Sequence, residues 1–227
     1  MPNTISTVSV DGNTGGETDA DSGGEAAAGQ ERWRGRSFLF LLASTRRGGN
    51  TEALARMAAA TIPAGVEQRW IRLSEMALEP FADLRHDGDG DGVFPQPEGA
   101  QRTLLEATLG ATDLVVATPV YWYSVSAAAK LYLDYWTAWM RVPGVDFRAR
   151  MAGKRMWAVA AHTSDDLQQI EPLVGTLRLS AEYLAMRWSG VLLGYANRPG
   201  ELAEDPGVAE RAGAFFTPAA PHGTPAD

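Results

Sequence analysis

Residues 44–51, Ser-Thr-Arg-Arg-Gly-Gly-Asn-Thr, combine side chains that proteins use to bind a phosphate or another anion. Arg46 carries a guanidinium group that can pair bidentately with a phosphate. Ser44, Asn50 and Thr51 add short polar groups, and the glycine pair lets the backbone approach a ligand closely. The stretch matches neither common nucleotide-binding pattern, G-x-G-x-x-G or G-x-x-x-x-G-K-[ST]. The alternative is a capped helix with two solvated arginines, so the choice depends on where the stretch lies in the fold.

A second stretch, residues 117–136, carries aromatic side chains suited to a flat ligand. Pro119 ends an apolar run because proline cannot continue the ladder of a strand. Tyr121, Trp122 and Tyr123 then follow one another at this expected strand end, where large rings are poorly placed for a core but well placed to flank a ligand. The alternative is that some of these rings pack beneath the loop or in a subunit interface.

Short apolar runs alternate with helical patterns, and this alternation positions both stretches. Apolar or strand-like runs predict strands over residues 37–43, 113–118, 155–161 and 188–195, and an alternating pattern predicts one over residues 66–73. The helical patterns predict helices over residues 50–61, 99–110, 125–140 and about 172–186. Such alternation is typical of an open α/β domain with a parallel sheet covered on both faces. Ligands bind outside the carboxyl ends of such strands, which points to the loops after Ala43, Thr118 and Ala161.

The two stretches, ASTRRGGNTEAL and ATPVYWYSVSAAAKLYLD, resemble the paired motifs of the flavodoxin-like FMN-dependent oxidoreductases. This group includes the NAD(P)H-dependent FMN and quinone reductases, and the resemblance covers roughly residues 37–200. It implies an open parallel five-stranded sheet of order 2-1-3-4-5 with helices on both faces and FMN at the switch point. It also implies NADPH or NADH as the reductant, and a homodimer.

The resemblance assigns ligand-binding roles to residues in three loops. The FMN phosphate is expected to bind Ser44, Arg46, Asn50 and Thr51, with Arg47 left in water. The isoalloxazine ring is expected to contact Pro119, Val120, Tyr121 and Trp122. The pyrimidine edge of the ring is expected to receive hydrogen bonds from Thr163 and Ser164. The substrate pocket is expected to include Tyr123, His86 and His162.

The chain also departs from the family pattern. The third loop lacks the glycines often found there, and Asp134 is followed by Tyr135 where an arginine is common. The related iron–sulfur flavoproteins carry a cysteine cluster, whereas this chain has no cysteine and forms none. No thiolate catalysis or disulfide is therefore expected either.

Residues 87–98 match the calcium-loop pattern of EF-hands, from Asp87 at position 1 to Glu98 at position 12. No clear helix leads into this loop, and Pro95 and Pro97 obstruct its second half. Asp-Gly repeats are also common in ordinary loops, so we expect no metal site. No G-x-S-x-G elbow accompanies the three histidines, and a serine hydrolase is therefore disfavoured.

The acidity of the chain lies mainly in its tails. The net charge is −8, of which residues 1–36 carry −3 and residues 201–227 carry −4. We expect residues 1–36 to be a disordered tail, residues 37–200 an FMN-binding domain, and residues 201–227 an extension with a short helix and a loose end. No basic stripe for nucleic acid, no membrane span and no signal peptide are apparent, so the cytoplasm is the expected location.

These observations predict an oxidoreductase that passes electrons from NAD(P)H through FMN to a quinone, a free flavin or a similar small acceptor. No catalytic side chain is expected, because the flavin carries the chemistry. One alternative is a flavodoxin-type electron carrier, although such carriers usually have strongly acidic surfaces and residues 37–200 carry a net charge of only −1. The other is a flavin-free regulatory or binding module on the same fold.

Overall fold

The computed structural model describes residues 31–86 and 92–217, which belong to two units, Met1–Arg34 and Gly35–Asp227. In the first unit, residues 31–34 form a turn in which the Arg34 amide donates to the carbonyl oxygen of Glu31 (3.1 Å). The fold and the candidate site belong to the second unit. The tails predicted to be disordered fall largely outside the described residues.

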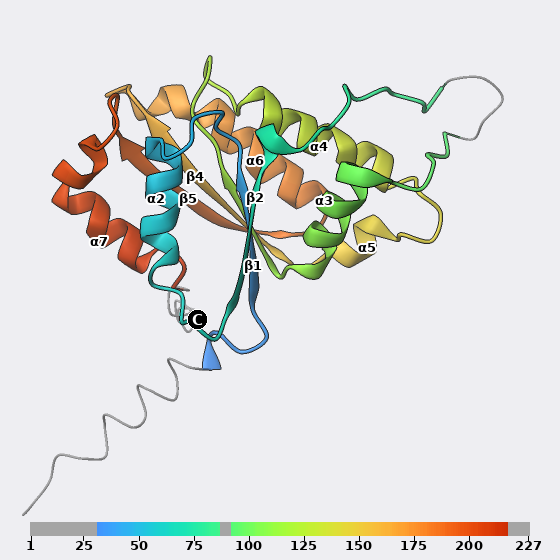
Figure 1. Ribbon diagram of the computed structural model, residues 1–227, viewed down its shortest axis with the longest axis horizontal. Coiled ribbons are helices and arrows are strands. Elements are labelled where there is room, and N and C mark those ends of the chain that lie inside the picture. Colours follow the sequence, from blue (N-terminus) through green and yellow to red (C-terminus); the bar gives the residue numbers. More distant parts are fainter. Residues whose placement is uncertain (1–30, 87–91, 218–227) are drawn as a thin grey trace, which may run out of the picture. The chain divides into compact units, whose positions relative to one another are not determined.

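Five parallel strands form one sheet in the order β2-β1-β3-β4-β5 (Figure 1), which confirms the predicted topology. The strands are β1 (Ser37–Leu42), β2 (Glu67–Arg72), β3 (Asp113–Ala117), β4 (Arg155–His162) and β5 (Arg187–Tyr195). Leu42 aligns with Arg72 of β2 and with Ala117 of β3. The carboxyl ends of these three strands are therefore level, and the loops that follow them start at the same edge.

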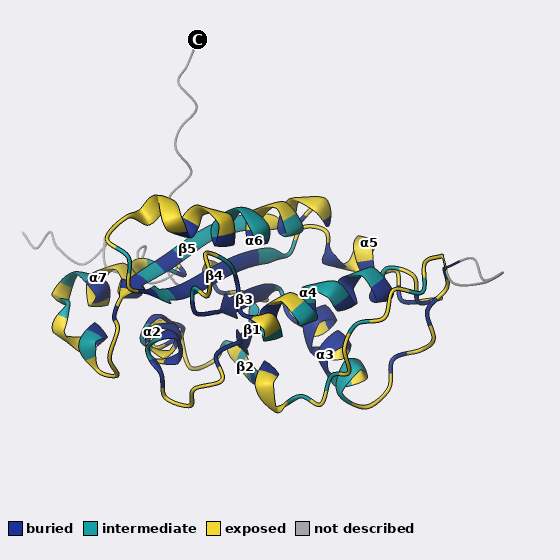
Figure 2. Ribbon diagram, turned by 90° about the horizontal axis from the view of Figure 1, so that it is seen from above, coloured by how far each residue is buried: buried dark blue, intermediate teal, exposed yellow. Residues whose placement is uncertain are grey.

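Helices cover both faces of the sheet (Figure 2). One face carries α2 (Asn50–Ala59) and α7 (Pro206–Ala214), and the other carries α3 (Gly99–Gly110), α4 (Ala127–Trp139) and α6 (Glu171–Tyr183). The shorter elements are α5 (Phe147–Met151), η1 (Leu73–Glu75), η2 (Leu167–Ile170) and η3 (Glu201–Glu204). The helix α5 was not predicted, because five residues are too few to show a helical period.

The two sheet faces bury alternate residues of the same strands, which explains why the central strands β1 and β3 are apolar almost throughout. In β1, Leu39 and Leu41 belong to the core cluster beneath α3 and α4. On the opposite face, the ring of Phe216 packs edge-on against Phe38 and Phe40, with centroids 5.2 and 5.8 Å apart. Phe216 follows α7 and is fully buried, so the segment beyond residue 200 contributes to this core.

A buried charged cluster ties the opposite, amino-terminal edge of the sheet together. The carboxylate of Asp113, the first residue of β3, accepts hydrogen bonds from Arg36 Nε (3.1 Å) and Trp157 Nε1 (2.8 Å). Arg36 Nη1 also donates to the carbonyl oxygen of Phe216 (3.2 Å). Because these partners come from distant parts of the chain, the cluster is a structural link and lies away from the ligand edge.

Within residues 31–86 and 92–217, no group of three or more His, Asp or Glu side chains is placed to hold a metal ion. The first five residues of the calcium-type pattern, 87–91, lie outside the described residues. None of the described helices is long and apolar enough to cross a membrane.

Candidate cofactor and substrate site

The loops that follow β1, β3 and β4 meet at the carboxyl edge of the sheet (Figure 1), and two adjoining cavities open between them. Each cavity has a volume of about 220 Å³. The first cavity is lined by Ser44, Arg46, Gly49, Asn50, Thr51, Pro119, Val120, Tyr121, Ala161, His162, Thr163, Ala196 and Asn197. The second cavity is lined by Val120, Trp122, Tyr123, His162, Thr163, Ser164, Gln169 and Ile170.

The structure brings together all ten residues predicted to bind the cofactor, since each lines one or both of these cavities. Of the three residues predicted for the substrate pocket, Tyr123 and His162 line the second cavity. His86 lines neither cavity and is exposed in the loop between β2 and α3. It lies near Asp83, whose pKa is lowered to about 2, mainly by hydrogen bonds from Arg85.

The start of α2 offers backbone amides to the first cavity. Gly49 is the N-cap and supplies no side-chain cap, and the first helical amide with a carbonyl partner is that of Ala53 (2.9 Å to Gly49). The amides of Asn50 and Thr51 are therefore available to an anion. Gly48 has a φ of +64°, and a Cβ on Gly49 would lie 3.3 Å from Cβ of Arg46. Both positions thus favour glycine.

The two arginines of the loop have different surroundings. Arg47 Nη2 pairs with Glu75 Oε1 at 2.6 Å on the exposed side of the loop. The side chain of Arg46 lines the first cavity, and no described carboxylate lies within ion-pair distance of it. This difference supports Arg46 as the phosphate ligand.

A fourth loop, which follows β5, also contributes to the first cavity and was missed from the sequence. Asn50 Nδ2 donates to the carbonyl oxygen of Arg198 (3.0 Å), which ties this loop to the start of α2. Glu201 Oε2 accepts from the amides of Asn197 and Arg198 (2.6 and 2.8 Å). Asn197 is thereby held in the cavity wall. The feature of the sequence that could have identified Asn197 is its position directly after a parallel strand, at the edge of the sheet where ligands bind.

Two buried hydroxyl groups fix the second loop. Thr118 Oγ1 accepts from the Ser126 amide (2.9 Å). Ser126 Oγ donates to the carbonyl oxygen of Ala43 (2.7 Å) and accepts from the Ala129 amide (3.3 Å), so it caps α4 and joins the loop to the end of β1. The first and second loops are therefore fixed relative to each other.

The tip of the second loop is a tight turn with unusual residues. Tyr121 and Ser124 exchange two backbone hydrogen bonds of 3.0 Å. Trp122 and Tyr123 between them have φ values of 49° and 65°, a left-handed conformation usually taken by Asn-Gly. Trp122 is 93% exposed, so burial within the chain does not offset the strain. Strain of this kind is characteristic of functional sites.

The third loop is organised around His162. Burial lowers the pKa of this histidine, and its Nδ1 lies 3.0 Å from the carbonyl oxygen of Ser164. The ring is therefore neutral at pH 7 with the proton on Nδ1, which leaves Nε2 as an acceptor. The Ser164 hydroxyl lies within hydrogen-bond distance of Gln169 Oε1 (3.0 Å) and the Asp166 carbonyl oxygen (3.2 Å), and these acceptors compete with its predicted role as a donor to the flavin.

Comparison with known proteins decides the family. Residues 37–180 match the model of the NADPH-dependent FMN reductases. The chain belongs to this family. Among its relatives is YwqN of Bacillus subtilis (strain 168), named as a candidate NAD(P)H-dependent FMN-containing oxidoreductase. The two are 31% identical over 162 residues, which cover 71% of this chain and 86% of YwqN.

Solved structures of other proteins share the fold of this FMN reductase family member. The Trp repressor binding protein from Bacillus subtilis superposes with a TM-score of 0.61 at 23% identity, covering 81% of this chain and all of that one. The apo form of the NADH:FMN oxidoreductase EMOB superposes with a TM-score of 0.56, also at 23% identity, covering 80% of this chain and 86% of that one.

FMN is the cofactor of the family, and the residues of the first cavity fit it. A dianionic phosphate requires several donors, and the start of α2 provides backbone amides, the Arg46 guanidinium and the Thr51 hydroxyl within one loop. The isoalloxazine ring requires a flat apolar neighbour, and Pro119, Val120 and Tyr121 line the same cavity.

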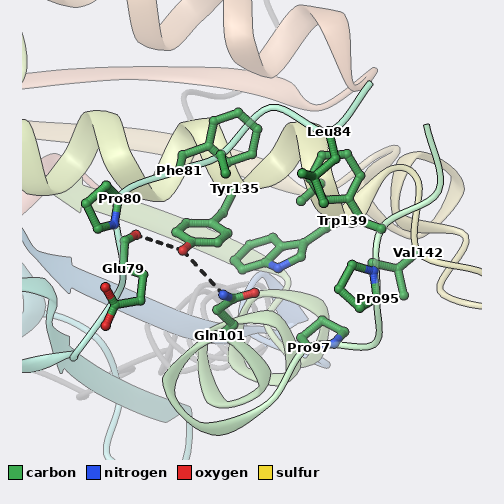
Figure 3. A pocket seen from close by; sticks show the side chains of 13 residues that line it. Glu79, Pro80, Phe81, Leu84, Pro95, Pro97, Gln101, Tyr135, Trp139 and Val142 are labelled. Carbon is green, nitrogen blue, oxygen red and sulfur yellow. Dashed lines mark hydrogen bonds between the residues drawn. The ribbon is translucent and has the colours of Figure 1, made fainter. Parts of the chain in front are cut away.

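A third cavity, of about 210 Å³, lies between α4 and the loop that joins β2 to α3 (Figure 3). It is mainly apolar and aromatic and shares no residue with the first two cavities. The Tyr135 hydroxyl donates to the Glu79 carbonyl oxygen (2.8 Å) and accepts from Gln101 Nε2 (3.3 Å) at its edge. Tyr135, which departs from the family pattern, thus belongs to this cavity and not to the cofactor site.

Proposed function

We propose that this NAD(P)H-dependent FMN reductase passes electrons to a quinone, a free flavin or a similar small acceptor that enters the second cavity. The observation that carries the proposal is that the two cavities adjoin, since Val120, His162 and Thr163 line both. A ligand in the second cavity would adjoin a cofactor in the first. Formation of a homodimer and a cytoplasmic location belong to the same proposal.

The side chains of the first cavity would hold FMN at its phosphate and along its isoalloxazine ring. Arg46, Asn50 and Thr51 would bind the phosphate together with the amides at the start of α2. When bound, FMN would supply the redox chemistry, namely hydride acceptance and two-electron transfer. The protein's own task is therefore to bind, orient and expose the ring, and no general acid or base is required.

His162 lines both cavities and would act through its neutral form. Its Nδ1–H is engaged by the Ser164 carbonyl oxygen, and the ring lies edge-on to Tyr195 at 5.8 Å. The imidazole is thus fixed in one tautomer, with Nε2 left as the acceptor for a ligand N–H group.

The exposed rings of Trp122 and Tyr123 would form the wall against which a flat acceptor stacks. Both line the second cavity, and both lie in the turn that is closed by backbone hydrogen bonds between Tyr121 and Ser124. An aromatic wall accepts flat molecules of different outline, which agrees with a quinone or flavin as the acceptor.

Absorption spectroscopy tests this proposal. The purified full-length protein, reconstituted with FMN, is expected to show flavin bands that NADH or NADPH bleaches without oxygen. Addition of menadione or riboflavin should then restore the bands. Bound flavin that neither nucleotide bleaches would instead favour an electron carrier, and a failure to bind any flavin would favour a flavin-free binding module.

A further inference from the structure

We infer that Arg72 and Glu52 are positioning residues that hold the phosphate loop, residues 44–51, in its binding conformation and so favour FMN over riboflavin. The inference rests on the proposed FMN site in the first cavity. Neither residue lines that cavity, and neither was predicted from the sequence to bind the cofactor.

Glu52 fixes the loop from the side of α2. It lies in the first turn of the helix with its side chain only 8% exposed, and its Oε2 accepts the Gly48 amide (3.0 Å). Burial alone would raise the pKa of this carboxyl, but hydrogen bonds from Arg72, the Gly48 amide and Arg56 outweigh it and lower the pKa to about 2. The carboxylate is therefore charged throughout the physiological range.

Arg72 fixes the loop from the side of the sheet. It is the last residue of β2, and its side chain is 12% exposed. Its Nη2 donates to Glu52 Oε2 (2.5 Å), and its Nη1 donates to the backbone carbonyl oxygen of Arg46 (3.3 Å). One planar guanidinium thus joins the helix, the sheet and the residue proposed to bind the phosphate.

These contacts fix the backbone of the loop at three points. The Arg46 amide donates to Ser44 Oγ (3.2 Å), the Arg46 carbonyl oxygen accepts from Arg72, and the Gly48 amide donates to Glu52. These three backbone groups are thus bonded within the protein, whereas the amides of Asn50 and Thr51 stay available to a ligand. A loop ordered in advance loses less conformational entropy on binding.

The position of Glu52 sets two physical effects against each other. A carboxylate close to a phosphate site repels the phosphate, so on charge alone Glu52→Gln would tighten FMN binding. If Glu52 positions the loop, the same change weakens FMN binding, because an amide cannot accept from Arg72, Arg56 and the Gly48 amide together. The direction of the change distinguishes the two effects.

Flavin binding to matched variants tests the inference. Arg72→Met and Arg69→Met remove the same charge from the same strand, but Arg69 is an exposed residue outside the first cavity. Apoproteins of full length are titrated with FMN and with riboflavin, and quenching of flavin fluorescence gives each Kd. Arg72→Met is expected to weaken FMN binding about tenfold, as for the loss of a charged hydrogen bond, without changing riboflavin binding. Arg69→Met should change neither.

Further variants separate geometry from charge. Arg72→Lys keeps the charge but lacks the planar fork that bridges two acceptors, so it should also weaken FMN binding. This variant takes the place of Arg72→Met in the titration if Arg72→Met does not fold. Glu52→Gln should weaken FMN binding. The inference is overturned if Arg72→Lys binds FMN like wild type, if Glu52→Gln binds it equally or more tightly, or if riboflavin binding falls in parallel. If the wild type binds neither flavin, the proposed function itself fails.

Discussion

At the scale of single residues, two adjacent arginines differ in what they contact. Arg47 pairs with Glu75 on the surface, whereas Arg46 lines the first cavity with its carbonyl oxygen held by Arg72. The same residue type therefore has two different surroundings in one loop. A guanidinium without a carboxylate partner is the one that can bind a phosphate without first breaking an ion pair.

Removal of the two arginine side chains should therefore have unequal effects. Arg46→Ala is expected to raise the Kd for FMN about 10- to 100-fold, as for loss of a hydrogen bond to a charged group. Arg47→Ala removes the same charge from the same loop and should leave the Kd nearly unchanged. Titration of both apoproteins with FMN measures this difference. Equal Kd values for the two variants would remove Arg46 from the phosphate site.

At the scale of elements, the turn between β3 and α4 combines backbone strain with exposed rings. Trp122 and Tyr123 adopt a left-handed conformation that costs non-glycine residues of the order of 1 kcal/mol. The turn is closed by hydrogen bonds between Tyr121 and Ser124, and Ser126 anchors the following helix. The hydrogen bonds on either side of Trp122 and Tyr123 thus hold these two residues in the strained conformation, in the wall of the second cavity.

Tyr123→Gly is expected to raise the free energy of unfolding by about 1 kcal/mol, because glycine adopts a positive φ without a steric penalty. It should also raise the KM for a quinone acceptor, because the second cavity loses an aromatic wall. Ala185→Gly is the control, since Ala185 has a φ of 54° and lies outside both cavities. This variant should gain stability with no change in KM, as urea unfolding and steady-state kinetics would show. A loss of stability in Tyr123→Gly would contradict the assignment of strain.

At the scale of the whole domain, the segment after β5 completes both the site and the core. The loop after β5 supplies Asn197 to the first cavity, and Phe216 closes the sheet face beside α7. Arg36 links the carbonyl oxygen of Phe216 to the buried Asp113. The expected boundary at residue 200 stays a prediction, but the segment beyond it is integral to the packing.

Phe216→Ala is expected to lower the free energy of unfolding by about 3–5 kcal/mol, because it removes a fully buried ring from the core. Phe215→Ala removes the neighbouring ring, which is only half-buried, and should cost clearly less. Urea unfolding of the two variants measures the difference. Similar losses in both would show that Phe216 does not close the sheet face as described.

Much of the fold could be predicted because it depends on local periodicity. Apolar runs such as residues 37–43 and 113–118 predict buried strands directly, and their alternation with helices fixes a parallel sheet. The element ends moved by only a few residues in the structure, as at α4, where the predicted 125–140 became Ala127–Trp139. The short α5 escaped prediction because one turn of helix shows no period.

The sequence by itself determined the sheet, its ligand edge and the three loops that carry the proposed cofactor residues, because these depend on patterns within short segments. Only the tertiary structure decided which side chains share a cavity. It left His86 outside both cavities and brought in Asn197. It also brought Arg72 from β2 against the carbonyl oxygen of Arg46. The physical reason is that hydrogen bonds and ion pairs join residues far apart in the chain, and their partners exist only once the strands have been assembled side by side.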